Sequence, residues 1–374
     1  MLKLKVPEQK DILLRNLRKK VRQELVSAFD DLKSVIVKSN WEVLSKFEQS
    51  EVIKLKPKFR TQGSFAYGTL VMPHWRSQEI DIDDGVYFPM TMVKSNPVMM
   101  HNVIFTVLDD VLKSIADKHD WTVIKKPTCS RLVTKSGAHI DVPAYAMPDQ
   151  RFAQLKNAME SLTSSLSKDD RDFDRELIDS LEANEVNLVH REKGYIKSDP
   201  ALIREWVNDC KRDYKQPFFN LCMIVKGWRD FQWEKGGPSS IALMVAVYHV
   251  FCSEEIPDNL DEALLKVSKR LPLLLSNRLE HPKLSGEYIY IPSESEASEV
   301  REKAILFSQS LENAIIYSGT RENCIGHFKE CLGFRVPNTP DAVEDYRCDF
   351  KPKAYSNHKP AIVVNPITGN TRAG

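Results

Sequence analysis

The sequence predicts an α+β protein, in which a twisted mixed sheet covered by helices is followed by a helical lobe. Two observations favour this class. Strand-like runs alternate with long helical patterns over the first 150 residues, and helical spacing dominates from about residue 200 onward. A chain of 374 residues is long enough for roughly two domains. We expect a core with an N-terminal helix at 1–150, a connecting segment at 151–200, a helical lobe at 201–350 and a mobile tail at 351–374.

The first element is a long helix over residues 8–38, which has two distinct faces. Its apolar face holds Ile12, Leu13, Leu17, Val21, Leu25 and Phe29. Its basic face holds Arg15, Arg18, Lys19, Lys20 and Arg22. We expect the basic face to be solvated, and contact with a substrate phosphate is the alternative.

The sheet is expected to begin within residues 59–88, which are typical of a strand, a glycine turn, a connection and a second strand. Pro97 begins a second helix, and its apolar residues recur at the spacing of a helix that covers a sheet. Three short strand-like runs follow at 121–125, 130–134 and 138–145.

The second half is predicted to be mostly helical. One helix spans residues 218–232, and a Gly-Gly-Pro turn that ends at Pro238 separates it from the next helix. Ser239 and Ser240 stand where an N-cap and a first turn belong. Residues 293–311 have the pattern of a further amphipathic helix.

The composition is that of an ordinary globular protein. Lys and Arg number 53 against 52 Asp and Glu, so the net charge of +1 argues against a general nucleic-acid coat or a polybasic membrane binder. No apolar run approaches the ~20 residues of a membrane span, and the N-terminus lacks the apolar stretch of a signal peptide. The seven cysteines are scattered, which is typical of reduced thiols. We expect a cytoplasmic protein without a membrane partner.

A zinc site is a minor alternative for one group of residues. Cys324 and Cys331 flank His327, but no second ligand pair follows at zinc-finger spacing. We therefore interpret these cysteines as core or surface thiols.

The residues with the clearest chemistry follow the first predicted strand. Gly63 and Ser64 form a turn whose backbone can approach an anion. Asp81 and Asp83 come later, two residues apart between isoleucines, so on a strand both project from one face. Asp84 would face the other way. Two convergent carboxylates can hold Mg2+, and the pattern suggests metal-assisted phosphoryl or nucleotidyl transfer; the alternative is a pair of turn carboxylates.

Several motifs in one order resemble the bacterial cGAS/DncV-like nucleotidyltransferases, called CD-NTases, a branch of the polymerase-β-like superfamily. The motifs are residues 62–69, 78–85, 139–143, 186–188, 197–200, 226–230 and 236–241, within a resemblance that covers roughly residues 10–335. The resemblance implies a polymerase-β-like nucleotidyltransferase core plus a helical lobe. It also implies an active site in the cleft between them.

The resemblance implies a catalytic triad of Asp81, Asp83 and Asp141, which would bind two Mg2+ ions, with Mn2+ as a possible substitute. Asp141 lies inside an apolar strand pattern, where taken alone it would be weak support for a metal site.

The resemblance also implies a set of nucleotide-binding residues: Gln62, Gly63, Ser64, Tyr67, Arg131, Ser198, Lys226 and Ser240. Gly63 and Ser64 would hold the β- and γ-phosphates of the donor, and Lys226 and Ser240 further triphosphate oxygens. Three of these residues have ordinary alternatives. Tyr67 could be core packing, Lys226 a snorkelling surface charge and Arg131 a surface ion pair.

The function implied is a cyclic oligonucleotide synthase that makes a cyclic dinucleotide, with 3′,3′-cGAMP from ATP and GTP the first choice. One departure leaves guanine selection open, since Gly286, beside Glu287, stands where the family pattern has an acidic residue. The alternatives are a cyclase with another base choice, including a trinucleotide product, a linear template-independent transferase acting on RNA or a small acceptor, and a non-catalytic binding protein.

The family also implies partners. The product would activate a downstream effector in antiphage (CBASS) signalling, and no nucleic-acid activator is expected. In related operons an E1/E2-like enzyme conjugates the C-terminus of the nucleotidyltransferase. The end of this chain at Gly374 fits such a site, and it equally fits an ordinary frayed terminus.

Overall fold

The computed structural model describes residues 4–31, 58–89, 97–147, 150, 153, 186–197 and 200–339. Most of the predicted connecting segment and the whole predicted tail lie outside these residues, as do Ser198 and Gly374. The predictions that concern them, and the predicted domain bounds, therefore stay predictions.

The N-terminal helix α1 (Glu8–Asp31) packs through a face that overlaps the predicted one only in part. The buried side chains are Leu14, Leu17, Val21 and Leu25, which recur at helical spacing. Ile12 and Leu13, predicted to lie on the apolar face, are 50% and 45% exposed. The buried face therefore includes Leu14 in place of Ile12 and Leu13, while the predicted burial of Leu17, Val21 and Leu25 is confirmed.

The basic face of α1 is not uniformly solvated, so that expectation was wrong. Arg18 is buried and donates from Nη1 to Thr61 Oγ1 at 2.5 Å. Arg22 Nη2 donates to Asp84 Oδ1, also at 2.5 Å. Lys19 and Lys20 are exposed as expected. The two arginines compensate polar groups on the neighbouring strands, which would otherwise be buried without partners.

Among the described residues the sheet is mixed and seven-stranded, with the order β1-β2-β5-β4-β3, while β6 pairs with β5 and with β7. The strands are β1 (Lys58–Gln62), β2 (Ile80–Pro89), β3 (Thr122–Lys125), β4 (Cys129–Val133), β5 (Ala138–Met147), β6 (Asn187–His190) and β7 (Gly194–Lys197). Of the strand pairs that the structure describes in this sheet, β2 with β5 is the parallel one. The three predicted short strands are confirmed. The sequence interpretation missed β6 and β7, because four-residue strands contain too little periodicity to stand out.

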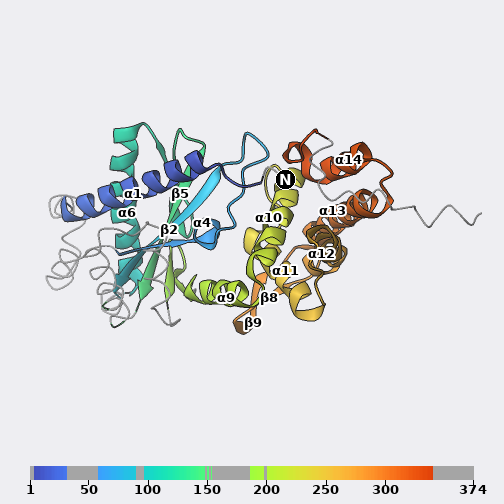
Figure 1. Cartoon of the computed structure of the whole chain (residues 1–374). Helices are drawn as coiled ribbons and strands as arrows, with labels where there is room; N and C mark the ends of the chain where they lie inside the picture. The colour runs from blue at the N-terminus through green and yellow to red at the C-terminus, as the bar shows by residue number, and fades with distance from the viewer. Residues whose placement is uncertain are drawn as a thin grey trace, which may run out of the picture.

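Helices α1 and α6 (Pro97–His119) lie on one side of the sheet (Figure 1). Ile80 and Ile82 of β2 are buried in the core that they share with these helices. Because alternate residues of a strand face opposite sides, Asp81 and Asp83 lie on the other face. Asp84 points toward α1 instead, as predicted, where it pairs with Arg22.

The second half consists mainly of helices. They are α9 (Pro200–Asp213), α10 (Lys215–Gln232), α11 (Ser240–Ser253), α12 (Leu260–Leu275), α13 (Glu294–Glu312) and α14 (Arg321–Leu332), with a π-helical turn η2 (Asn313–Tyr317) and a 3-10 turn η3 (Gly333–Arg335). Ser239 caps α11 by accepting from the backbone N–H of Ala242, as predicted. A hairpin of β8 (Leu279–His281) and β9 (Leu284–Tyr290) interrupts the helices and was not expected.

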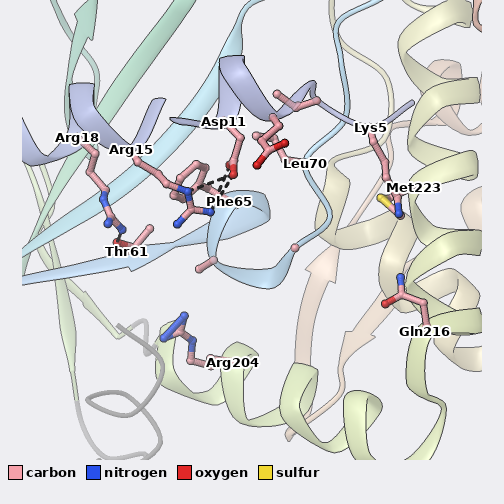
Figure 2. A pocket seen from close by; sticks show the side chains of 14 residues that line it. Lys5, Asp11, Arg15, Arg18, Thr61, Phe65, Leu70, Arg204, Gln216 and Met223 are labelled. Carbon is pink, nitrogen blue, oxygen red and sulfur yellow. Dashed lines mark hydrogen bonds and ion pairs between the residues drawn. The ribbon is translucent and has the colours of Figure 1, made fainter. Parts of the chain in front are cut away.

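Helix α10 lies between the sheet and the helices α12, α13 and α14 (Figure 1). A cavity of about 470 Å³ is lined by residues of α1, of α9, of α10 and of a short helix α4 (Gly63–Tyr67). Figure 2 shows Arg15, Arg18 and Arg204 around it, with Arg15 paired to Asp11.

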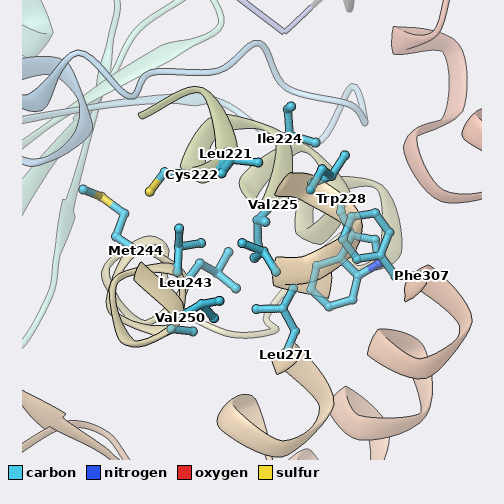
Figure 3. Packing of buried hydrophobic residues seen from close by; sticks show 14 of the residues in the cluster. Leu221, Cys222, Ile224, Val225, Trp228, Leu243, Met244, Val250, Leu271 and Phe307 are labelled. Atoms are coloured by element: carbon cyan, nitrogen blue, oxygen red, sulfur yellow. The ribbon is translucent and has the colours of Figure 1, made fainter. Parts of the chain in front are cut away.

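The core of the helical half is centred on α10 and α11 (Figure 3). Trp228 is fully buried and stacks on Phe307, with ring centroids 5.0 Å apart and an interplanar angle of 15°. This packing holds α10 rigidly, and with it the polar residues that the helix presents toward the sheet.

The two cysteines that flank His327 are core thiols, as interpreted from the sequence. Cys324 and Cys331 are buried, while His327 contacts Glu330. In the part of the chain that the structure describes, the grouping able to hold a metal is Asp81, His139 and Asp141, not these cysteines. No helix among the described residues is long and apolar enough to span a membrane.

Candidate active site

Strand pairing brings the three predicted carboxylates together. In the parallel pair of β2 and β5, Asp83 is opposite Asp141 and Asp81 is opposite His139. The antiparallel neighbours add Gln62 of β1 opposite Asp83, and Arg131 of β4 opposite Asp141. Side chains at paired positions lie on the same face of a sheet, so these residues converge at one place.

The electrostatics of the cluster are those of crowded carboxylates. Burial, together with the charges of Asp81 and Asp141, raises the pKa of Asp83 to about 7. Burial also works to raise the pKa of Asp141. The hydrogen bonds and charges of Arg131 and Lys126 outweigh this effect and leave the pKa of Asp141 below its ordinary value.

The donor set fits a hard divalent cation. Ligand atoms of Asp81, His139 and Asp141 all lie within 4.8 Å of one another, and the Asp83 carboxylate is close enough to be destabilised by two of them. Among the described residues, Asp81 Oδ1 is buried without an aligned hydrogen-bond partner. Carboxylate oxygens are the ligands that Mg2+ prefers, and a cation would relieve the repulsion between them.

Arg131 is not a surface ion pair, because it neutralises the carboxylate cluster. Its Nε is 2.5 Å from Asp141 Oδ1 and its Nη2 is 2.8 Å from Oδ2, a bidentate arrangement. The same Nη2 lies 3.7 Å from Asp81 Oδ2, and Lys126 Nζ donates to Asp141 Oδ2 at 3.1 Å. Two cations of the protein therefore face the acids that the sequence assigned to metal binding.

Gly63 is placed where only a glycine fits. Its φ is +64°, and it begins the short helix α4, where a turn was expected. A Cβ built on Gly63 would lie 3.0 Å from Asp83 Cγ and closer still to Oδ2. The backbone can therefore approach the carboxylate closely because the side chain is missing.

Gln62 is held between two tyrosines. Its Nε2 donates to Tyr87 Oη at 2.6 Å, and it accepts from Tyr145 Oη at 3.0 Å. The two tyrosine rings stack at 4.8 Å. This arrangement fixes the end of β1, from which Gly63 and Ser64 follow directly.

The side chains of Tyr67 and Lys226 are both buried. Tyr67 is 9% exposed and packs in the core of the helical half, as the core-packing alternative has it. Lys226 is 3% exposed, so it is not a snorkelling surface charge. Its Nζ donates to the Thr69 carbonyl at 2.5 Å, and burial lowers its pKa to about 8.

Ser240 is the first residue of α11, and its Oγ accepts from Arg229 Nη2 at 3.2 Å. Arg229 also donates to the carbonyl of Pro238 and to Asp230. The sequence interpretation did not single out Arg229, which ties α10 to the start of α11.

The cavity of Figure 2 is a separate place from the carboxylate cluster. Its lining includes Thr61 of β1 and Phe65 of α4, whereas the cluster meets the same two elements through Gln62 and Gly63. The cavity lining contains none of the three carboxylates.

Sequence reasoning missed three residues at the cluster: Lys126, described above, and the pair of His139 and Glu79. His139 Nε2 lies 2.9 Å from Asp81 Oδ1, and Nδ1 lies 3.1 Å from Glu79 Oε2. Burial works against the charged ring, but the neighbouring Asp81 leaves the pKa of His139 raised. A signal was present in the sequence, since His139 stands two residues before Asp141 and so shares its face of the strand.

Comparisons with known proteins agree with this geometry. The nucleotidyltransferase domain model of DncV-like cyclic GMP-AMP synthases matches residues 57–145, and the C-terminal domain model matches residues 216–344. A cyclic GMP-AMP synthase of Escherichia coli is 32% identical over 90% of this chain and 88% of its own length. One from Vibrio cholerae is 36% identical over 65% of this chain and 59% of its own length.

Solved structures show the same fold. Vibrio cholerae DncV with the linear intermediate 5′ pppA(3′,5′)pG superposes with a TM-score of 0.75 at 28% identity, over 91% of this chain and 94% of that one. The 3′-deoxy GTP-bound Escherichia coli DncV gives 0.74 at 29% identity, with the same coverage. The fold is therefore that of the polymerase-β-like nucleotidyltransferases. This chain belongs to the bacterial cGAS/DncV-like nucleotidyltransferases, the CD-NTase family.

Proposed function

We propose that this chain joins ATP and GTP into 3′,3′-cGAMP. Family membership makes it a nucleotidyltransferase of the kind that produces cyclic dinucleotides. The observation that carries the finer proposal is the meeting of Asp81, Asp83 and Asp141 beside the glycine that begins α4. Acids and a close backbone approach are what a nucleoside triphosphate with its metal requires.

Asp81, Asp83 and Asp141 are proposed to hold two Mg2+ ions, or Mn2+ in their place. When bound, these ions would lower the pKa of the attacking ribose hydroxyl and neutralise charge on the departing pyrophosphate. Arg131 and Lys126 neutralise Asp141 in the free protein. Both side chains would then be released toward the phosphates of the acceptor nucleotide, which suits the planar guanidinium of Arg131.

The donor triphosphate is proposed to lie along α4 and α10. Gly63 and Ser64 would direct backbone N–H groups to the β- and γ-phosphates, while Lys226 and Ser240 contact further oxygens. Burial lowers the pKa of Lys226, and a nearby triphosphate would favour its charged form. Gln62 and Ser198 complete the proposed contacts. Tyr67 would need to turn out of the core to stack on a base.

Two features of relatives support the substrates and the order of steps. A solved DncV complex contains GTP in nonhydrolyzable form, and another contains the linear intermediate pppA(3′,5′)pG. We propose the same order here, with a linear dinucleotide formed first and cyclised after it turns in the site. The choice of guanine has less support than the order of steps. Gly286 stands where the family pattern has an acidic residue; it is exposed, and its N–H donates to Glu280.

The biological setting is also part of the proposal. The cyclic product would activate an effector in CBASS antiphage signalling, and an E1/E2-like enzyme would conjugate Gly374. A cytoplasmic location would supply the nucleoside triphosphates. It is consistent with the six free cysteines in the described part of the chain.

The test is an incubation of the purified full chain with all four isotopically labelled NTPs and Mg2+. Products are resolved by mass spectrometry, before and after nuclease P1 digestion. We expect one AMP and one GMP in a ring that nuclease P1 opens, and no product from Asp81→Asn or Asp83→Asn. A ring of other bases would correct only the base choice. Linear chains that lengthen when RNA is added would replace the proposal with template-independent transfer.

A further inference from the structure

The side chain of Asp81 is more exposed to solvent than that of Asp141. Its side chain is 45% exposed, against 11% for that of Asp141. Asp141 is gripped by Arg131 and Lys126, whereas Asp81 is 3.7 Å from Arg131 at Oδ2. An exposed carboxylate rotates readily about its side-chain torsions, so without further support a metal site built on it would lack a defined geometry.

The opposite oxygen of Asp81 faces His139. The two residues are register partners on β2 and β5, and Nε2 lies 2.9 Å from Oδ1. Among the described residues, neither of these buried atoms has another partner with hydrogen-bond alignment. A buried polar atom left without a partner costs about 1–3 kcal/mol, so a small rotation that aligns these two atoms with each other is favoured.

The other ring nitrogen of His139 is also occupied. Nδ1 lies 3.1 Å from Glu79 Oε2, and the His139 side chain is only 7% exposed. Glu79 directly precedes β2, and Asp81 is the second residue of that strand. One short segment therefore supplies both carboxylates that contact the His139 ring. A histidine held at both nitrogens has a defined orientation.

We propose that Glu79 and His139 are positioning residues, which hold the Asp81 carboxylate in its metal-binding orientation by donation from His139 Nε2 to Asp81 Oδ1. This inference rests on the proposed metal role of Asp81. It leaves Asp81 Oδ2 as the oxygen that meets the cation. His139 supports the ligand and is not itself a ligand, because both of its nitrogens already face carboxylates.

The test uses two substitutions that each imitate one ring nitrogen. In His139→Gln the side-chain amide nitrogen reaches the place of Nε2 and can still donate to Asp81. In His139→Asn the amide reaches only the place of Nδ1, so the donation to Asp81 is lost. The matched control is His190→Asn, since His190 is also buried in this half and its Nδ1 accepts from the Glu192 N–H, which an asparagine oxygen can imitate.

Mn2+ binding to the full-length protein is measured by isothermal titration calorimetry, and steady-state kinetics are measured with Mg2+. We expect His139→Asn to weaken Mn2+ binding by about 10-fold or more, the usual cost of losing an outer partner of a metal ligand. His139→Gln should stay within about threefold of the wild type, because it keeps the donor at Nε2. kcat should fall in His139→Asn while the KM for NTP changes little. His190→Asn should bind Mn2+ as the wild type does.

Two results would overturn the inference. One is wild-type Mn2+ affinity in His139→Asn. The other is a directly coordinated nitrogen in the pulsed EPR spectrum of Mn2+ bound to protein labelled with 15N-histidine, which would make His139 a ligand.

Two further variants complete the design. Glu79→Gln, at a side chain 32% exposed, tests the same chain of contacts if His139→Asn fails to fold, and it should also weaken Mn2+ binding. Unchanged affinity in Glu79→Gln counts against the inference in that case. Asp81→Asn separates the two proposals, because wild-type Mn2+ binding and activity in that variant would refute the metal triad itself.

Discussion

The close approach of Gly63 to Asp83 makes a sharp prediction about Gly63→Ala. A new Cβ would lie 3.0 Å from Asp83 Cγ and closer to Oδ2, so the carboxylate must move. The backbone adds strain, because an alanine at φ +64° costs about 1–2 kcal/mol. A displacement of about 1 Å in a reacting geometry can cost on the order of 100-fold in rate. We therefore expect a modest loss of stability and a loss of at least about 100-fold in kcat.

The chain offers a matched control at the other end of α4. Gly68 also has a positive φ, +74°, but a Cβ there meets nothing within 4 Å. Gly68→Ala should therefore lose a similar 1–2 kcal/mol from backbone strain alone, as roughly estimated for a left-handed alanine, while keeping its activity. Urea denaturation measures the first quantity, and the rate of cyclic dinucleotide formation measures the second. Equal activity in the two variants would refute the argument that the side chain of residue 63 displaces Asp83.

Three further predictions concern charge and burial. Asp83→Asn should stabilise the metal-free protein, by on the order of 1–4 kcal/mol given about 1.4 kcal/mol per pKa unit. The folded pKa of about 7 lies above the ordinary 3.8, so wild-type stability falls as pH rises from 4 to 7; melting curves should show a larger gain at pH 8 than at pH 5. Arg335→Ala should destabilise by about 2–6 kcal/mol, at about 1–3 kcal/mol for each buried carbonyl left without a donor, because this buried side chain donates to the carbonyls of Gly227 and Met72; the exposed Arg301→Ala should change urea stability by less than about 0.5 kcal/mol. Lys226→Met should raise the KM for NTP by about 10- to 100-fold, the worth of a charged hydrogen bond, without changing Mn2+ affinity; an unchanged KM would remove Lys226 from the nucleotide site.

Three predictions that rested on local pattern were confirmed, whereas the same kind of pattern wrongly placed Ile12 and Leu13 on the buried face of α1. The alternation around Asp81 and Asp83 correctly separated the carboxylate face from the isoleucine face. Asp84 was correctly assigned to the opposite side. Ser239 was recognised as a helix cap from its neighbours alone. In each case the outcome depends on strand parity or on the first turn of a helix, which adjacent residues set.

The burial of charged side chains, by contrast, depended on residues far away in the chain. Arg18, expected on a solvated face, is buried and donates to Thr61. The predicted nucleotide-binding role of Lys226 stays a prediction, but its burial excludes the surface alternative and comes with a hydrogen bond to the Thr69 carbonyl. No window around either residue contains its partner. His139 shares its strand face with Asp141, which was a local signal, but its contacts Glu79 and Asp81 lie about 60 residues earlier and were not visible from the sequence.

The sequence by itself determined the family, the carboxylate pair on β2 and the order of the main helices, because motifs and periodicity are properties of neighbouring residues. The resemblance also implied that Asp141 joins that pair, but only the tertiary structure decided that Arg131 and His139 contact these carboxylates and that α10 is buried against the loop after α4. Those contacts form when distant segments close on one another and bury a shared core. Which distant segments pair depends on the packing of the whole chain rather than on any local pattern.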